Sequence, residues 1–328
     1  MNNCVYVSIK QVCRFLKKHD NYVLITHAQP DGDTLGSASA LCLGLRQMGK
    51  KATIICPDEI PEKYGFFTLG CVDSSFEEQT VIACDVADLV LIGALREKYE
   101  GKFDLCIDHH VSNKHFADRL LLDDKASACG EVIYAVLKAL RIDINRIIAA
   151  ALYCAISTDT GCFKYSNTTA KCHRIVADLF DMGVDYENIN RLMFETKSRN
   201  RVEMERRALD GMTFHFGGRC AVMVISAAMR KETGCGDDEL EGVTAISRTV
   251  EGVLAGVTVK EKDNGAYKIS VRTYPPLNAS AICQKLGGGG HHSAAGCELE
   301  GSLDSVIERI LEQVKIALED LGAGDYTC

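Results

Sequence analysis

The chain has no uncharged apolar segment long enough to cross a membrane. The longest such stretch, Ile147 to Thr158, has twelve residues and ends at Asp159, whereas a membrane-spanning helix needs about 20. The N-terminus also lacks a basic segment followed by an apolar core, which a secretory signal would show. We therefore expect a cytoplasmic protein without a membrane span.

An excess of positive charge is also missing. The 37 lysines and arginines are outnumbered by 45 aspartates and glutamates, which gives a net charge of −8. Proteins that bind long nucleic acid through its phosphates usually carry the opposite sign. The balance argues against long duplex nucleic acid as a partner, and a phosphate ligand would need a local positive centre.

Several common motifs are absent. The closest two of the 16 cysteines, Cys154 and Cys162, are eight positions apart, so we interpret the cysteines as reduced, mostly buried thiols and not as C-x-x-C zinc ligands. The chain contains neither a G-x-G-x-x-G fingerprint nor a G-x-S-x-G turn. Gly44 to Lys51 approaches a phosphate loop, but it lacks the final Ser/Thr and lies at the end of a predicted helix.

The length indicates two domains, because one hydrophobic core rarely serves 328 residues. An apolar content of 47% with 25% charged residues is typical of a globular protein. We place the first domain at residues 1–185 and the second at 210–328. Between them, residues 186–209 are charged and helix-favouring without a broad apolar stripe, so we expect a helical connector.

The first domain alternates short apolar runs with helical patterns. Buried strands are predicted at Tyr22–Thr26, Ala52–Cys56, Thr80–Cys84 and Asp104–Ile107. Helices are predicted at Leu35–Met48, Ser127–Leu140, Asn145–Ser157 and Thr168–Met182. This alternation predicts an α/β fold with a mostly parallel, doubly wound sheet, whose ligands collect where the strands end.

The second domain is predicted to be a smaller α/β domain. Its strands are expected at Cys220–Ile225, Val253–Val259 and Tyr267–Val271, and its closing helix at Leu303–Leu321.

Carboxylates and imidazoles stand at the ends of the predicted elements of the first domain. A buried element that ends in such a group loses solvation free energy unless a partner is present. Their repeated occurrence at successive element ends therefore points to one common site. The residues are His27, Asp31, Asp33, Asp85, Asp108, His109, His110 and Asp159.

The charge count of this set favours two divalent metal ions. Asp31, Asp33, Asp85 and Asp159 carry four negative charges, which match two divalent cations, and one carboxylate could bridge them. Oxygen and imidazole ligands without thiolates suit Mn²⁺, Fe²⁺ or Zn²⁺ better than Mg²⁺. We expect two Mn²⁺, with other divalent metals as alternatives.

A second candidate site is the run Gly287, Gly288, Gly289, Gly290 and His291. Consecutive glycines reduce stability through chain entropy, but their backbone N–H groups are unobstructed and can form an anion site. A flexible linker is the alternative interpretation. Arg272 could add a planar guanidinium fork for a phosphate.

Together these motifs resemble the DHH phosphoesterase family, in the subgroup that joins a DHH domain to a DHH-associated C-terminal domain. The chain is similar to stand-alone nanoRNases (oligoribonucleases) that also act on adenosine 3′,5′-bisphosphate. One departure is that the family usually has Ser after Arg272, where this chain has Thr273-Tyr-Pro-Pro276. The matching motifs are His27-x-x-Pro30-Asp31-x-Asp33, Asp85, Asp108-His109-His110, Thr158-Asp159-Thr-Gly161 and Gly287 to Gly296.

The resemblance implies a role for each site residue. One Mn²⁺ would be held by His27, Asp31 and Asp85, and the other by Asp33, Asp85, His109 and Asp159. His110 would contact the scissile phosphate, while Asp108 would orient the imidazoles. Arg272 and residues 287–291 would bind the far end of the substrate, with the active site in the cleft between the domains.

The implied activity is a manganese-dependent phosphodiesterase that hydrolyses di- to roughly pentanucleotides to mononucleotides, and adenosine 3′,5′-bisphosphate to AMP. A phosphodiesterase of linear or cyclic dinucleotide messengers and a nucleotide-binding module without activity are the alternatives. The presence of all six expected metal ligands favours an enzyme. The sequence does not determine which base is preferred or from which end oligomers are cleaved. It also leaves open whether RNA or DNA is the substrate and whether the protein is a monomer or a homodimer.

Overall fold

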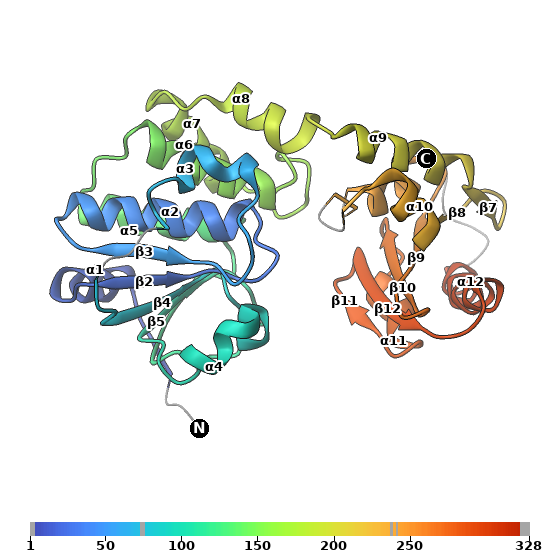
Figure 1. Ribbon diagram of the computed structural model, residues 1–328, viewed down its shortest axis with the longest axis horizontal. Helices are drawn as coiled ribbons and strands as arrows, with labels where there is room; N and C mark the ends of the chain where they lie inside the picture. Colours follow the sequence, from blue (N-terminus) through green and yellow to red (C-terminus); the bar gives the residue numbers. More distant parts are fainter. Residues whose placement is uncertain (1–3, 73–75, 237–238, 241, 322–328) are drawn as a thin grey trace. The chain divides into compact units, whose positions relative to one another are not determined.

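The computed structural model describes residues 4–72, 76–236, 239–240 and 242–321 (Figure 1). The chain divides into two compact units, Met1–Thr196 and Lys197–Cys328. This division falls inside the segment that we predicted as a connector, and the predicted limits at 185 and 210 stay predictions. Within the described ranges, no helix combines the length and apolar character that a membrane span requires.

The first unit is built on a parallel sheet of six strands in the order β1-β6-β5-β4-β2-β3. The order reverses around β2, because the chain continues from it to β3 on one side and returns to β4 on the other. Such a reversal is where parallel sheets bind ligands. The strands are β1 (Val5–Tyr6), β2 (Tyr22–Ile25), β3 (Ala52–Ile55), β4 (Thr80–Cys84), β5 (Leu105–Asp108) and β6 (Arg119–Leu122).

Helices cover both faces of this sheet, which confirms the doubly wound α/β prediction. Tyr22 and Leu24 of β2 pack into the core beneath α2, α5 and α6, whereas Val23 and Ile25 face the opposite core beside α4 (Figure 1). The long elements are α1 (Ile9–Lys18), α2 (Gly32–Gln47), α5 (Cys129–Leu140), α6 (Arg146–Asp159) and α7 (Ala170–Asp181). The short ones are η1 (Glu62–Tyr64), α3 (Gly65–Thr68), η2 (Leu89–Leu95), α4 (Arg96–Tyr99), α8 (Tyr186–Asn190) and η3 (Arg191–Glu195).

Helix α2 begins three residues earlier than we predicted. Asp31 caps it, since its Oδ1 accepts hydrogen bonds of 3.0 Å from the backbone N–H groups of Asp33 and Thr34. An acidic side chain is a favourable N-cap because it satisfies N–H groups that have no partner inside the helix. Asp33 therefore stands on the first helical turn and not on a loop.

Two glycines let α2 approach α6 closely. A Cβ at Gly36 would lie 2.3 Å from the carbonyl oxygen of Ala151, and one at Gly32 would lie 2.4 Å from Oγ1 of Thr158. Both separations are too short for any larger residue. The close packing brings the start of α2, with its two aspartates, against the end of α6 at Asp159.

The second unit contains a mixed sheet of six strands in the order β11-β12-β10-β9-β8-β7, in which only β8 and β9 pair in parallel. The predicted smaller α/β domain is confirmed. Its strands are β7 (Thr213–His215), β8 (Cys220–Ile225), β9 (Ala255–Glu261), β10 (Tyr267–Thr273), β11 (Gly289–Gly290) and β12 (Ala294–Leu299).

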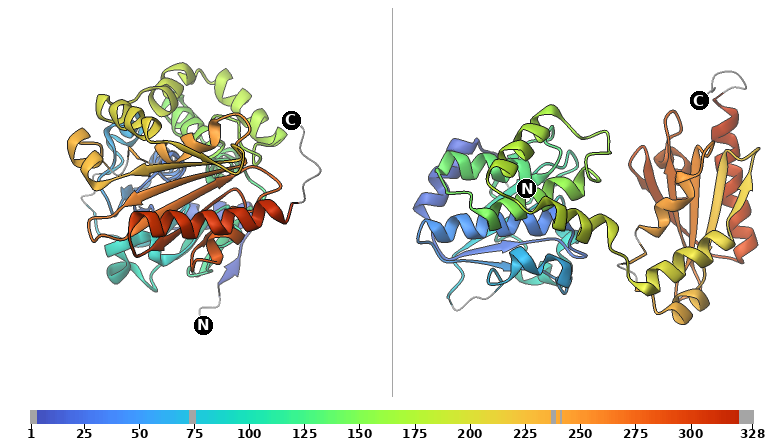
Figure 2. Two further views of the ribbon diagram at one scale, coloured as in Figure 1. Left: turned by 90° about the vertical axis from the view of Figure 1, so that its right-hand side faces the viewer. Right: turned by 90° about the horizontal axis from the view of Figure 1, so that it is seen from above.

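Each face of the second sheet packs on its own helices. One face, which includes Val257 and Val271, packs against α11 (Ala279–Gln284) and α12 (Leu303–Glu319), and α12 crosses it in Figure 2. The other face, with Met223, packs against α9 (Arg199–Asp210), α10 (Ala227–Thr233) and η4 (Val243–Thr249). Alternate residues of a strand therefore point to different helical layers.

Candidate active site

The sequence-predicted metal ligands converge at the carboxyl end of the first sheet. His27 follows β2, Asp85 follows β4, and His109 follows β5, so neighbouring strands deliver them to one place. Three groups of side chains have ligand atoms within 4.8 Å of one another. The groups are His27, Asp31 and Asp85; Asp33, His109 and Asp159; and Asp85, His109 and His110.

Asp85 faces both histidine ligands, one with each carboxylate oxygen. Its Oδ2 lies 3.8 Å from Nε2 of His27, and its Oδ1 lies 3.6 Å from Nε2 of His109. His109 Nε2 also lies 3.6 Å from a carboxylate oxygen of Asp33 and of Asp159. Two ligands about 2.1 Å from one ion are roughly 3 to 3.5 Å apart, so small inward shifts would close these sets around cations.

The hydrogen bonds of the two imidazoles leave Nε2 available as a ligand. Nδ1 of His27 lies 2.9 Å from the carbonyl oxygen of Ala28, and Nδ1 of His109 lies 3.1 Å from that of Ala126. A carbonyl can only accept, so Nδ1 carries the proton in each ring. This arrangement is common for metal-binding histidines because it fixes both the tautomer and the ring direction.

Two buried polar atoms test whether this donor set fits a cation. Oδ1 of Asp85 and Nε2 of His109 are buried, and neither has a hydrogen-bond partner in the described part of the chain. Leaving such atoms unsatisfied disfavours the folded state by about 1 to 3 kcal/mol each. Because both atoms are electron-pair donors that face each other, a divalent cation between them would satisfy both.

Repulsion among the carboxylates perturbs their protonation. Burial, followed by the charges of Asp33 and Asp31, raises the pKa of Asp85 well above its usual value. The same two causes raise the pKa of Asp159 to about 8. Like charges gathered in a poorly solvated place favour protonation unless a cation balances them.

The backbone at Asp85 is also unusual. Its φ of 59° lies in the left-handed region, which an aspartate adopts only at a free-energy cost. The conformation is held by a hydrogen bond of 2.9 Å from its N–H to the carbonyl oxygen of Ile107, on the neighbouring strand. The sheet therefore fixes the direction in which this carboxylate leaves β4.

Asp33 is anchored by donors that the sequence did not reveal. Its Oδ2 accepts 2.6 Å from the N–H of Cys129, and its Oδ1 accepts 2.9 Å from the N–H of Gly130 and from Oγ of Ser37. The first two donors form the start of α5, where unpaired N–H groups and the helix dipole favour an anion.

The adjacent histidines of the Asp108-His109-His110 motif have different surroundings. Nδ1 of His110 donates to Oδ1 of Asp108 at 2.8 Å, and this hydrogen bond raises the pKa of His110. Asn113 in turn donates to Oδ2 of Asp108 at 2.6 Å. Sequence reasoning missed Asn113, since nothing distinguishes it from any loop asparagine before its position is known.

The second candidate site lies in the second unit and is partly a strand. Gly289 and Gly290 form β11, which pairs with β12, so the alternative interpretation as a flexible linker does not hold at these two positions. The N–H groups of Gly287, Gly288 and His291 donate to carbonyl oxygens of the chain itself. Binding of a substrate by this run and by Arg272 therefore stays a proposal.

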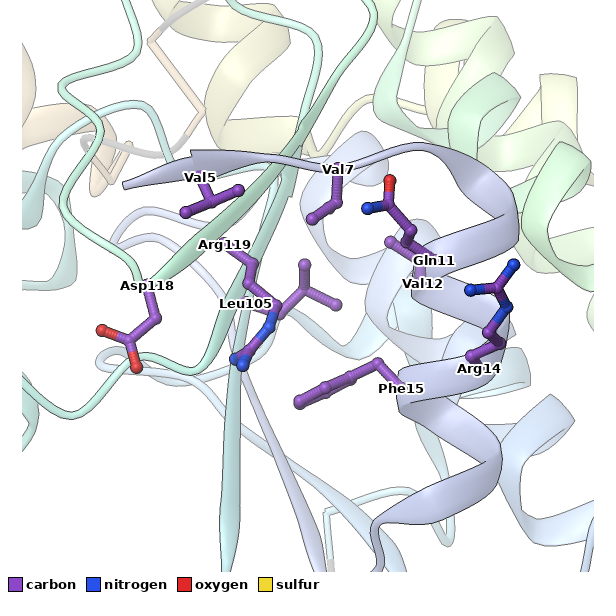
Figure 3. Close-up of a pocket in the computed structure, with 9 residues that line it drawn as sticks. All are labelled: Val5, Val7, Gln11, Val12, Arg14, Phe15, Leu105, Asp118 and Arg119. Atoms are coloured by element: carbon purple, nitrogen blue, oxygen red, sulfur yellow. The ribbon is translucent and has the colours of Figure 1, made fainter. Parts of the chain in front are cut away.

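A groove of about 450 Å³ lies away from the predicted metal ligands (Figure 3). It is lined by residues of α1 and β1 together with Leu105 and Arg119, the first residues of β5 and β6. The predicted ligands His27, Asp85 and His109 follow the carboxyl ends of their strands, so the groove belongs to the opposite end of the sheet. Arg119 covers the ring of Phe15 there, 5.1 Å from its centroid.

The family model described as the DHH family, N-terminal domain, matches residues 21–156, and that of the DHHA1 domain matches residues 217–320. The chain belongs to the DHH family and is a phosphoesterase of that family. It is 31% identical to the bifunctional oligoribonuclease and PAP phosphatase NrnA of Thermus thermophilus, over 96% of this chain and 95% of that protein.

Two solved structures share the fold. An exopolyphosphatase-related protein from Bacteroides fragilis superposes with a TM-score of 0.85 at 20% identity, over 94% of this chain and 95% of that one. The exonuclease RecJ bound to manganese superposes with a TM-score of 0.53 at 12% identity, over 97% and 96%. Both likenesses concern the arrangement of the chain alone.

The raised pKa of Asp159 predicts how pH changes the effect of a metal on stability. A carboxyl whose pKa rises on folding stabilises the fold while it is protonated, and this contribution disappears as the pH increases through about 8. The metal-free protein should therefore lose stability progressively from about pH 4 to about pH 8, so that it is less stable at pH 8.5 than at pH 6, whereas a bound cation replaces the proton. Thermal unfolding with Mn²⁺ and with a chelator should show a larger metal-induced increase in Tm at the higher pH.

The control for this measurement is Asp159→Asn, which has no carboxyl to titrate at that position and should show a smaller pH dependence. Equal increases in Tm at both pH values in the wild-type protein would contradict the explanation.

Proposed function

We propose that this protein hydrolyses short oligonucleotides, of two to roughly five units, to mononucleotides with the help of two Mn²⁺ ions. We further propose that it converts adenosine 3′,5′-bisphosphate to AMP. The observation that carries the proposal is Asp85, whose two oxygens face two separate ligand sets. The activities in the name of the Thermus thermophilus relative support the substrate class.

The residues fit two cations. His27 and Asp31 with Asp85 would hold one, and Asp33, His109 and Asp159 with Asp85 would hold the other. When bound, such cations polarise a phosphoryl oxygen and lower the pKa of water towards about 7, which provides a nucleophile at neutral pH.

His110 is proposed to stabilise the negative charge that grows on the phosphoryl oxygens. Its hydrogen bond from Nδ1 to Asp108 favours the protonated ring, so Nε2 can present a second N–H to the substrate. The His110 side chain is 38% exposed, whereas that of Asp108 is fully buried. A ligand can therefore reach the imidazole while the carboxylate orients it from behind.

The second unit is proposed to bind the part of the substrate that does not react. Arg272 would contact a phosphate, and the Gly287 to His291 segment would let a ligand approach the backbone. The local positive charge of cations and arginine would allow a chain of net charge −8 to bind a small anionic nucleotide. Binding far from the reacting phosphorus positions it for attack.

Measuring which substrates the protein cleaves tests the proposal. The Mn²⁺-loaded protein is incubated with di- to decanucleotides of RNA and DNA, with linear and cyclic dinucleotide messengers, and with adenosine 3′,5′-bisphosphate, and products are separated by chromatography. We expect mononucleotides from the shortest oligomers, a steep decline with length, and AMP from the bisphosphate. Cleavage of cyclic dinucleotides alone, or metal binding without phosphate release, would contradict the proposal.

The division of roles between the two adjacent histidines gives a prediction. His110→Ala should lower kcat by roughly 100- to 1,000-fold, as the loss of one transition-state contact does, while metal content stays unchanged. Asn113→Ala should cause a smaller decrease in kcat, because Asp108 loses one of its donors. His109→Ala is the contrasting variant and should lose metal. Metal content and kcat are measured for the three variants. Equal metal loss in His109→Ala and His110→Ala would contradict the proposed difference in role between the two histidines.

The glycine run gives a prediction because the fold requires glycine at some of its positions and leaves space for a side chain at others. A Cβ at Gly288 would lie 2.2 Å from the carbonyl oxygen of Gly296, whereas no described atom lies within 4 Å of a Cβ placed at Gly289. Gly289→Val should therefore fold normally but obstruct a ligand. Arg272→Ala should lose a charge-assisted contact worth about 1.5 to 3 kcal/mol.

Both changes should reduce kcat/KM for a dinucleotide far more than for a small activated phosphodiester, with metal content unchanged. Gly65→Val is the matched control, since a Cβ there meets only side-chain atoms of Leu69, at 3.9 Å. An unchanged ratio of the two kcat/KM values would show that the second unit does not bind substrate.

A further inference from the structure

An exposed aromatic ring stands beside Arg272 at the end of β10. Tyr274 is 44% exposed and follows the last strand residue, Thr273. Its backbone is held on both sides, because its N–H donates to the carbonyl oxygen of Leu254 at 3.0 Å and its carbonyl oxygen accepts from Leu277 at 3.1 Å. The ring is therefore presented to solvent from a fixed position.

A guanidinium lies over this ring. Cζ of Arg248 is 4.8 Å from the ring centroid of Tyr274. Nε of Arg248 is buried and has no hydrogen-bond partner in the ranges that the structure describes. A cation over an aromatic ring is attracted by its π electrons, and the pair restricts the ring's orientation.

Arg248 can lie beside Tyr274 because the strand beneath it, β9, has a glycine at position 256. A Cβ at Gly256 would lie 2.6 Å from the backbone nitrogen of Arg248 and 2.5 Å from Oγ of Ser247. Only glycine lets η4 lie directly on β9 at this point. Gly256 pairs with Arg272 in the sheet. Therefore η4 lies next to the position of Arg272 on the neighbouring strand.

The strand alternation places Arg272 on the same face as η4. Its neighbour Val271 packs into the core formed with α11 and α12, so Arg272 points to the opposite face. Arg272 also pairs with Ala294, whose carbonyl oxygen accepts from the N–H of His291 at 2.8 Å. Tyr274, Arg248, Arg272 and the glycine-histidine segment thus share one end of the second sheet.

We propose that Tyr274 stacks on a nucleobase of the substrate and that Arg248 is a positioning residue that holds the ring for it. Stacking on an aromatic side chain contributes about 1 to 3 kcal/mol per base and does not depend on base identity. The inference rests on the proposed function and extends it: the protein recognises the presence of a base beside the phosphate that Arg272 contacts, without selecting which base. Tyr274 lies in the segment where the chain departs from the family pattern.

The test compares a dinucleotide with two analogues in which one or the other nucleoside is abasic. Tyr274→Ala should raise KM for the dinucleotide by roughly 5- to 150-fold, which is 1 to 3 kcal/mol converted at 1.4 kcal/mol per factor of ten. The value of kcat should stay near that of the wild type. For the analogue that lacks the stacked base, KM should barely change, because the wild type has no stacking to lose.

Three further variants control the test. Tyr274→Phe keeps the ring and should behave like the wild type. Arg248→Ala should raise KM by a smaller factor than Tyr274→Ala, with kcat unchanged, because the ring remains but is no longer held. Tyr6→Ala removes another exposed tyrosine ring, 59% exposed on β1, and should have no effect.

Losses that are the same for the dinucleotide and both abasic analogues, or no loss in Tyr274→Ala, would overturn the inference. If the wild-type protein cleaves no dinucleotide, the proposed function fails separately, and calorimetry of AMP against ribose 5-phosphate decides the inference. Tighter binding of AMP that is lost in Tyr274→Ala would support stacking, and equal binding of the two ligands would contradict it.

Discussion

The structure of the first unit depends on holding mutually repelling carboxylates together. Asp31, Asp33, Asp85 and Asp159 meet around two imidazoles, and burial together with their like charges raises the pKa of Asp85 and of Asp159. Other parts of the fold offset the free energy of this repulsion. They are a hydrogen bond from the Asp85 backbone to β5, the N–H donors of α5 to Asp33, and the close packing of α2 on α6. Bound cations would balance these charges and remove the repulsion.

The surroundings of neighbouring residues, more than their type, decide what each can do. His109 and His110 are adjacent, but one ring donates to a neutral carbonyl and the other to a carboxylate. The first arrangement places the proton on Nδ1 and leaves the electron pair of Nε2 free, whereas the second raises the pKa of His110. The end of β5 would thereby provide both of the roles that we propose, a metal ligand at His109 and a hydrogen-bond donor to the substrate at His110.

Much of this site could be predicted from the sequence, because its residues follow apolar runs that form buried strands. The strands β2, β4 and β5 and the polar residues after them were identified in this way. Asn113, Gly32 and the N–H groups of Cys129 and Gly130 were not, since their roles depend on contacts between distant parts of the chain. Helix α1 was not predicted, although Ser8 and Gln11 form a capping box before its apolar pattern. Nor was it predicted that part of the glycine run pairs with β12 as a short strand, because that pairing depends on a contact that the run's composition does not show.

If Asp85 is shared by two metal ions, as we propose, its removal should damage both ligand sets, and the metal content of two variants measures this. Mn²⁺ bound per chain is measured by elemental analysis after gel filtration of the wild-type protein, His27→Ala and Asp85→Ala. The wild type should retain two ions, His27→Ala should lose one of them, and Asp85→Ala should retain fewer than His27→Ala because both ligand sets are damaged. Two ions retained by Asp85→Ala would contradict the shared site.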